Sequence, residues 1–238
     1  MSTSIEPINK ININENLILL DWDDTILPTS WLAKNKITID AVIHSDFMED
    51  LSIHQNCCYE FFTEVIKHAK IIIISNAEQG WVELSCQKFL PRIWPLISKI
   101  KIVSARTSYI TIANCPFTWK ELAFRVQIEV YVKNNLNIVK NIISIGDAVY
   151  ERNALILVSK DLKDMASNYY IKSIKFAETP NIFLLIQQLD TVSSNITQII
   201  EKDSDLDLML IQKPEEAIDP IHLFDPNEEI KKNNDSKI

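Results

Sequence analysis

The sequence predicts an α/β domain in which a doubly wound parallel sheet lies between two layers of helices. Three short apolar runs, at residues 17–20, 71–74 and 142–145, are rich in isoleucine and leucine, and polar residues follow each of them closely. Runs of this kind are typical of strands that are buried on both faces. Segments with a helical pattern separate them, and strands that alternate with helices favour right-handed βαβ units.

Further elements are expected in chain order around these three strands. Two weaker candidates, residues 101–105 and 173–176, would bring the sheet to a usual size. Five segments read as helices: residues 58–68, 78–89, 118–131, 150–165 and 181–200. The last is the clearest, because apolar residues recur in it at helical spacing and Thr179-Pro180 supplies an N-cap followed by proline in the first turn.

We expect one catalytic domain, residues 15–200, with less regular segments around it. Residues 1–14 are polar and are expected to form a flexible N-terminus. Residues 28–57 show no strong periodicity, which leaves a small cap and a loop insert as the two interpretations. Residues 201–238 lose the regular pattern and gain charge, which predicts an acidic, flexible C-terminal tail.

Composition excludes several classes of function. The formal net charge of the 238 residues is -8, which argues against a nucleic-acid partner. The apolar runs are too short to span a bilayer, and the polar N-terminus lacks the apolar segment of a secretory signal. The four cysteines show no Cys-x-x-Cys spacing, which favours reduced thiols. We therefore expect a cytoplasmic protein without a membrane partner, and its oligomeric state stays open.

The sharpest chemical feature is the run Asp21-Trp22-Asp23-Asp24-Thr25, directly after the first apolar run. A carboxylate can attack phosphorus and form an aspartyl-phosphate, which divides one difficult displacement into two easier ones. A second carboxyl group two residues later can protonate the leaving oxygen and then deprotonate water. Two carboxylates this close repel each other unless a cation lies between them or one of them stays protonated, and Mg²⁺ prefers such oxygen ligands.

The run from Leu17 to Thr25 resembles motif one of the haloacid dehalogenase-like superfamily, in which a strand ends in Asp-x-Asp-x-Thr. Residues 71–76 are similar to motif two, Lys120 matches motif three, and residues 142–151 resemble motif four. The motifs occur in the superfamily's order and cover about residues 15–190. The resemblance implies a Rossmann-like core with little or no cap domain, and a phosphatase-type activity.

The resemblance also implies a role for each matched residue. Asp21 would be the nucleophile and Asp23 the acid and base, while Ser75 would hydrogen-bond the phosphoryl group and Lys120 would offset negative charge. The metal ligands would be the Asp21 carboxylate, the Asp23 backbone carbonyl and Asp147.

Motif four also implies an acid after Asp147, and here that acid is Glu151, which would support the metal directly or through water.

Two positions depart from the usual motifs. Glu151 stands where the superfamily more often has aspartate, and its longer side chain can shift it to an indirect role. Asp24 replaces a glycine, but aspartate tolerates left-handed backbone geometry better than most residues. One of the chain's two glycines, Gly146, lies inside motif four, where a turn benefits from close backbone approach.

Several assignments keep a structural alternative. Trp22, Thr25 and Asn76 are candidate substrate-binding residues, yet the Trp22 indole fits packing better than binding, and its backbone amide is the group that would contact phosphate. Thr25 fits a bracing role in the turn as well. Lys120 competes with three other lysines, at positions 101, 133 and 140, each of which also fits a solvated surface charge.

The preferred interpretation is an Mg²⁺-dependent phosphatase that acts on a phosphorylated small molecule or a phosphoprotein. Short intervals between the motifs predict an open site, which by analogy favours a large substrate. Two alternatives remain: a non-catalytic phosphate- or partner-binding protein that has kept the fold, and a phosphomutase or phosphotransferase.

Overall fold

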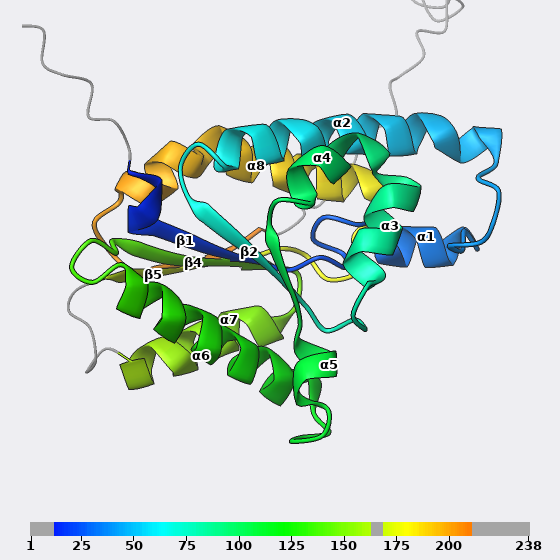
Figure 1. Cartoon of the computed structure of the whole chain (residues 1–238). Helices are drawn as coiled ribbons and strands as arrows, with labels where there is room; N and C mark the ends of the chain where they lie inside the picture. The colour runs from blue at the N-terminus through cyan, green and yellow to red at the C-terminus, as the bar shows by residue number, and fades with distance from the viewer. Residues whose placement is uncertain (1–11, 163–168, 211–238) are drawn as a thin grey trace, which may run out of the picture.

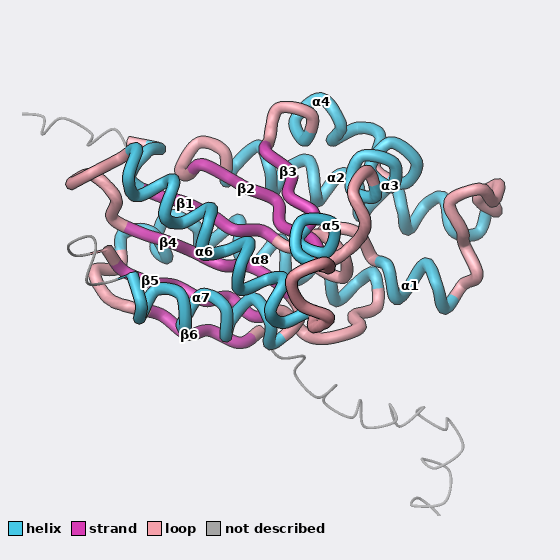
Figure 2. The backbone as a smooth tube through the Cα atoms, turned by 60° about the horizontal axis from the view of Figure 1, so that its bottom comes forward, coloured by secondary structure: helices cyan, strands magenta, loops and turns pink. Residues whose placement is uncertain are grey.

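A computed structural model describes residues 12–162 and 169–210 of the chain. In these ranges it contains one six-stranded sheet in which every neighbouring pair is parallel. Figure 2 shows the strands side by side in the order β3-β2-β1-β4-β5-β6. Their bounds are β1 (Asn16–Leu20), β2 (Lys70–Ser75), β3 (Lys101–Ser104), β4 (Asn141–Gly146), β5 (Tyr170–Lys175) and β6 (Leu206–Met209).

Helices cover both faces of the sheet (Figure 1). On one face lie α2 (Ser45–Val65), α3 (Trp81–Phe89), α4 (Trp94–Ile97) and α8 (Ile182–Glu201). On the other face lie α5 (Ala105–Tyr109), α6 (Pro116–Asn134) and α7 (Val149–Leu162). The short helix α1 (Thr29–Lys34) follows β1, and two 3₁₀ helices, η1 (Ile13–Glu15) and η2 (Pro91–Ile93), precede β1 and α4. This is a three-layer, Rossmann-like α/β/α arrangement.

Two apolar clusters, one on each face of the sheet, form the core. Alternate residues of β1 belong to different clusters, Ile18 and Leu20 to one and Leu17 and Leu19 to the other. This is why the strand reads as a continuous apolar run, since every side chain in it is buried. The predicted burial of these strands on both faces is confirmed.

The strand order reverses direction between β1 and β4, which creates a topological switch point. In open α/β sheets, ligands bind outside the carboxyl ends of the strands at this point. Leu20, the last residue of β1, pairs with Ile73 and Ile145, so the three strands end nearly level. The backbone amide of Asp21 still donates to the Ile145 carbonyl at 2.9 Å. The residues that follow these strands therefore meet at one edge of the sheet.

The elements follow the sequence prediction closely, with a shift at the start of α8. The predicted N-cap was Thr179, but Asn181 caps the helix, because its side chain accepts a hydrogen bond from the Leu184 amide at 2.8 Å. Thr179 has a left-handed backbone with φ of 48°. The strand predicted at 173–176 begins earlier, at Tyr170, and the helix predicted at 58–68 begins at Ser45.

Residues 28–57, expected to be a small cap or a loop insert, contain α1 and the first half of α2. Leu32 and Leu51 belong to the main apolar cluster, so this segment packs into the domain core. His54 is fully buried and its Nε2 lies 2.7 Å from the carbonyl of Ile26, to which it donates. Burial lowers the pKa of His54 to about 4, so the ring is neutral at pH 7. These contacts fasten α2 to the turn that follows β1.

The prediction of a flexible tail from residue 201 onward is wrong for residues 206–209. Residues 206–209 form β6, which pairs with β5 at the edge of the sheet. The strand escaped prediction because it is four residues long, carries a charge and is mostly exposed. Arg152 of α7 donates a hydrogen bond to Asp207 of β6, with 2.8 Å between Nε and Oδ1. The rest of the predicted tail, residues 211–238, and the N-terminal residues 1–11 lie outside the described residues.

None of the helices in the described ranges combines the length and the apolar character needed to cross a bilayer.

Candidate active site

Three carboxylates from distant parts of the chain converge at the switch point. Asp21 follows β1, Asp147 follows β4 and Glu151 lies in the first turn of α7. Each offers one oxygen, and these oxygens all lie within 4.8 Å of one another. Asp21 and Glu151 are buried, while Asp147 is partly exposed. The expected convergence of Asp21 and Asp147 is present.

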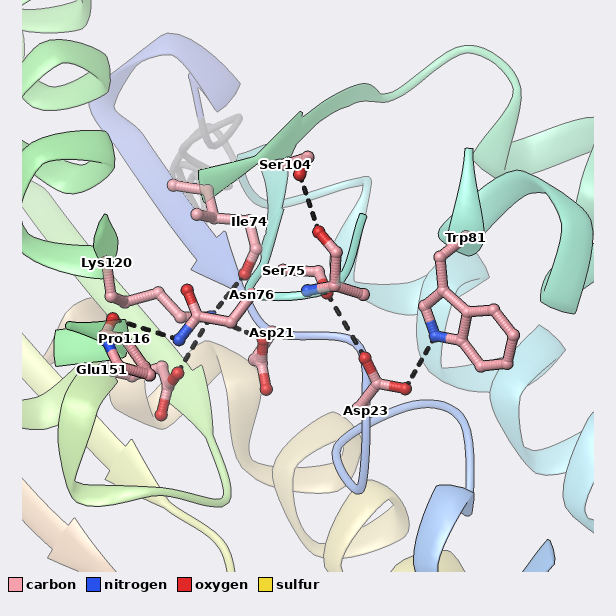
Figure 3. Close-up of polar contacts among 11 residues, drawn as sticks. Asp21, Asp23, Ile74, Ser75, Asn76, Trp81, Ser104, Pro116, Lys120 and Glu151 are labelled. Atoms are coloured by element: carbon pink, nitrogen blue, oxygen red, sulfur yellow. Dashed lines mark hydrogen bonds and ion pairs between the residues drawn. The ribbon is translucent and has the colours of Figure 1, made fainter. Parts of the chain in front are cut away.

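Lys120 reaches this cluster from α6 (Figure 3). Its Nζ lies 2.6 Å from Asp21 Oδ1 and 2.8 Å from Glu151 Oε1, and it donates to the Ile74 carbonyl at 2.6 Å. The side chain is 1% exposed. Among the lysines considered for motif three, Lys120 is therefore the one that contacts the carboxylate cluster.

The cluster combines three carboxyl groups with one lysine. Burial raises the pKa of Asp21 well above its usual value, and Glu151 and Asp147 raise it further against the opposing effect of Lys120. Burial, with help from Glu151 and Asp24, raises the pKa of Asp147 to about 7. The pKa of Lys120 is raised because Asp21 and Glu151 outweigh the effect of burial. A charged lysine thus faces three carboxyl groups, whose full ionisation needs another cation.

The residues present fit such a cation. The donors are carboxylate oxygens, which suit hard divalent ions, and the cluster is half-open on the side of Asp147. Within the described ranges, Glu151 Oε2 is buried without a hydrogen-bond partner. A buried carboxylate oxygen of this kind is stabilised by a metal ion or by a donor. The group Asp21, Asp147 and Glu151 is therefore a candidate metal site, and its geometry does not specify the ion.

Gly146 makes room for Glu151. A Cβ atom at position 146 would lie 2.5 Å from Glu151 Cγ and 2.9 Å from its Cδ, distances that real Cβ atoms do not adopt. The close approach expected at this glycine thus involves the Glu151 side chain.

We expect Gly146→Ala to displace Glu151 and to lower the free energy of unfolding by about 1–3 kcal/mol, the usual range for overpacking a filled site. Urea unfolding measures the change. In a Glu151→Ala background, where Cγ is absent, the same substitution should destabilise the protein much less. Equal destabilisation in both backgrounds would contradict the proposed contact.

Asp23 turns away from the carboxylate cluster and receives three hydrogen bonds, of which Figure 3 shows those from Ser75 and Trp81. Its Oδ1 accepts from the Thr29 hydroxyl at 2.7 Å and from the Trp81 indole at 2.9 Å, and Ser75 donates to Oδ2 at 3.3 Å. These donors come from three elements, α1, α3 and the end of β2. They hold the carboxyl group in one place beside the cluster.

The roles of Thr29 and Trp81 were missed by the sequence prediction. Thr29 lies in the segment without strong periodicity, and Trp81 belongs to none of the four matched motifs. The available signal was the neighbouring Gly80, which has a left-handed backbone with φ of 90° and starts α3.

The loop after β2 contributes Ser75 and Asn76. Ser75 Oγ accepts from the Ala77 amide at 2.9 Å while it donates to Asp23. Asn76 donates to the Pro116 carbonyl at 3.2 Å, and its Oδ1 is buried without a partner in the described part of the chain. Both side chains thus lie beside the cluster, as expected from motif two.

The Trp22 and Thr25 side chains face the interior. The Trp22 indole is fully buried and donates to Ser85 Oγ at 3.0 Å, which fits packing. Thr25 is also fully buried and its hydroxyl has no hydrogen-bond partner among the described residues, so it does not reach a substrate directly. Asp24 has the expected left-handed backbone, with φ of 54°, and accepts from the Ser30 amide at 2.7 Å.

Comparison with protein-family models, with curated proteins and with solved structures finds no match. The chemistry open to the site follows from its residues. It combines a buried carboxylate paired with a lysine, a candidate metal cluster, and a second carboxylate held by three donors.

Proposed function

We propose that this protein is an Mg²⁺-dependent phosphatase of the haloacid dehalogenase-like superfamily, which hydrolyses a phosphomonoester through an aspartyl-phosphate on Asp21. One observation carries the proposal: Asp21 meets Asp147, Glu151 and Lys120 at the switch point of the sheet. The four matched motifs supply these residues in the order that the resemblance implies.

In the first step, a carboxylate oxygen of Asp21 attacks phosphorus in line with the leaving oxygen. The bond between phosphorus and that oxygen breaks, and Asp23 donates the proton that converts the leaving alkoxide into an alcohol. In the second step, Asp23 accepts a proton from water, which attacks the aspartyl-phosphate and releases inorganic phosphate and free Asp21. The separate position of Asp23, directed toward Ser75 and Trp81, supports this division of roles.

Asp21, Asp147 and Glu151, with the Asp23 backbone carbonyl, would hold Mg²⁺. When bound, the ion would neutralise charge on the carboxylates and on the phosphoryl oxygens. Glu151 also pairs with Lys120, so its second oxygen is the one left for a direct or water-mediated contact.

Lys120 offsets the charge of Asp21 before and during the transfer. Ser75 and Asn76 lie on the loop next to Asp23 and would bind the phosphoryl oxygens, together with the Trp22 backbone amide. The described residues contain no separate cap domain, because α1 and α2 pack into the core. Both small phosphorylated molecules and phosphoproteins remain candidate substrates.

The proposal is tested by an assay of the purified protein with an aryl phosphate, with MgCl₂ or with excess EDTA. We expect hydrolysis with Mg²⁺ and its loss with EDTA. Asp147→Asn should raise the Mg²⁺ concentration for half-maximal rate by roughly tenfold or more, because a charged ligand is lost. Asp207→Asn on the edge strand is the control and should leave it unchanged.

Inactivity of the wild type with Mg²⁺ would overturn the proposal. Transfer of the phosphoryl group to an added alcohol in preference to water would favour a phosphotransferase.

A further inference from the structure

A cavity of about 240 Å³ opens beside the proposed catalytic residues, at the ends of β2 and β3. Its walls come from the loop after β2, the start of α3 and helix α5. The polar residues of the walls include Ser75, Gln79, Glu83, Ser104, Thr107 and Ser108.

We propose that this cavity binds the leaving group of the substrate, and that it selects small alcohols that carry hydrogen-bond donors and no negative charge. This inference rests on the proposed phosphatase function. It assigns the substrate class that the reaction residues leave open.

The position of the cavity follows from Asp23. The leaving oxygen must come within hydrogen-bond reach of the acid that protonates it. Ser75 forms part of the cavity wall and donates to Asp23, and Gly80 and Val82, on either side of Trp81, also line the cavity. Trp81 itself donates to Asp23. An alcohol that leaves phosphorus next to Asp23 therefore has this cavity as its neighbour.

The walls offer several hydroxyl oxygens as acceptors. The Ser104 hydroxyl donates to the Ala77 carbonyl at 2.6 Å, and the Ser108 hydroxyl donates to the Ser104 carbonyl at 2.8 Å. These hydrogens are already used within the protein, whereas hydroxyl oxygens can accept further bonds. Thr107 Oγ1 accepts from the Gln79 amide at 3.0 Å.

Glu83 gives the cavity its charge. Its Oε2 is buried and has no hydrogen-bond partner among the described residues. The other acid of the wall, Glu78, lies 3.5 Å from Arg106 and is therefore offset. A carboxylate in the wall of the cavity favours a ligand that donates to it, and it repels an anion.

The size of the cavity points to a small ligand. Its volume is smaller than the range of roughly 300–1,000 Å³ typical of drug-sized ligands. The leaving groups that fit are amino alcohols and short polyols.

Two pairs of phosphate esters test the inference, each matched in size. Phosphoethanolamine is compared with phosphoglycolate, and glycerol 3-phosphate with 3-phosphoglycerate, so that each pair exchanges a donor for a carboxylate. We expect kcat/KM to be roughly tenfold or more higher for the donor-bearing member, the effect of one hydrogen bond to a charged group. Glu83→Gln should reduce this ratio for the phosphoethanolamine pair. Glu49→Gln, the same change on the exposed face of α2, should leave it unchanged.

A second variant keeps the test valid if Glu83→Gln fails to fold. Ser108 is exposed on α5 and lines the cavity, so Ser108→Leu fills part of the space with apolar atoms. It should raise KM for glycerol 3-phosphate and phosphoethanolamine more than for an aryl phosphate.

The outcomes distinguish the inference about the cavity from the proposal that the protein is a phosphatase. Hydrolysis of the aryl phosphate without preference within either pair would overturn this inference and leave the phosphatase proposal standing. Faster turnover of a phosphoserine peptide than of all four esters would overturn it as well, in favour of a macromolecular substrate. Inactivity with every phosphate, the aryl phosphate included, would overturn both.

Discussion

Asp21→Asn is expected to lower kcat for an aryl phosphate by on the order of 10⁴-fold or more, because an amide oxygen replaces the attacking carboxylate. The substitution is nearly isosteric and keeps a polar group opposite Lys120, so the fold should persist. Circular dichroism and urea unfolding check this point, and steady-state kinetics at saturating Mg²⁺ measure the loss of rate.

Loss of rate alone does not separate a nucleophile from a metal ligand. Asp23→Asn provides the discrimination, because it removes the acid and base while Asp21 remains. A nitrophenolate leaving group needs little protonation, so the first step should survive and the second should slow. A phosphoenzyme should then accumulate on Asp21, detected as a covalent mass increase after rapid quenching.

The mechanism would fail if Asp21→Asn retained a substantial part of the wild-type rate. It would fail equally if Asp23→Asn, with measurable turnover, formed no covalent adduct.

The strands were predictable because burial on both faces leaves a strong mark on a short segment. Leu17 to Leu20 must contact helices above and below the sheet, so all four are apolar and none alternates with a polar residue. Asp21, the next residue along, lies beyond the end of the strand and is charged although it is still buried. The sequence therefore predicts both the strand and the place where chemistry begins.

The missed elements have the opposite character. The edge strand β6 has one neighbour and is mostly exposed, so its sequence lacks a continuous apolar run. The first half of α2 buries only a narrow stripe, including Leu51 and His54, and other apolar residues in it, Met48 and Ile53, are exposed. Such segments depend on tertiary contacts, such as the one between His54 and Ile26, that no local pattern records.

The residues of the candidate site likewise include some that the sequence predicts and some that it does not. Asp21, Asp147 and Lys120 could be placed because each follows or adjoins a recognisable element. The hydrogen bonds that Thr29 and Trp81 donate to Asp23 join residues across three elements, and their geometry exists only in the folded chain. The burial of Thr25 and of the Trp22 indole likewise follows from packing, which the spacing of the motif does not encode.

Lys120→Met should destabilise the protein strongly as well as inactivate it. Methionine keeps much of the side-chain volume but removes the ammonium that Asp21 and Glu151 share at 2.6 and 2.8 Å. Breaking a buried ion pair leaves uncompensated charge and costs about 3–5 kcal/mol. Urea unfolding in EDTA should show a loss of this size. Lys133→Met, on the exposed face of the same helix, where the pair with Glu129 spans 3.6 Å, should change stability by less than about 1 kcal/mol.

The cause of this loss of stability can be tested by removing one of the two carboxylates, Asp21 and Glu151, that Lys120→Met leaves without a partner. In Lys120→Met with Glu151→Gln, the buried negative charge falls by one, and part of the stability should return. Activity should stay low, because the ammonium group that pairs with Asp21 is still missing. Added Mg²⁺ should also stabilise Lys120→Met, since a ligand that binds the native state alone shifts the unfolding equilibrium. If Lys120→Met were as stable as Lys133→Met, the charge balance described for this cluster would be wrong.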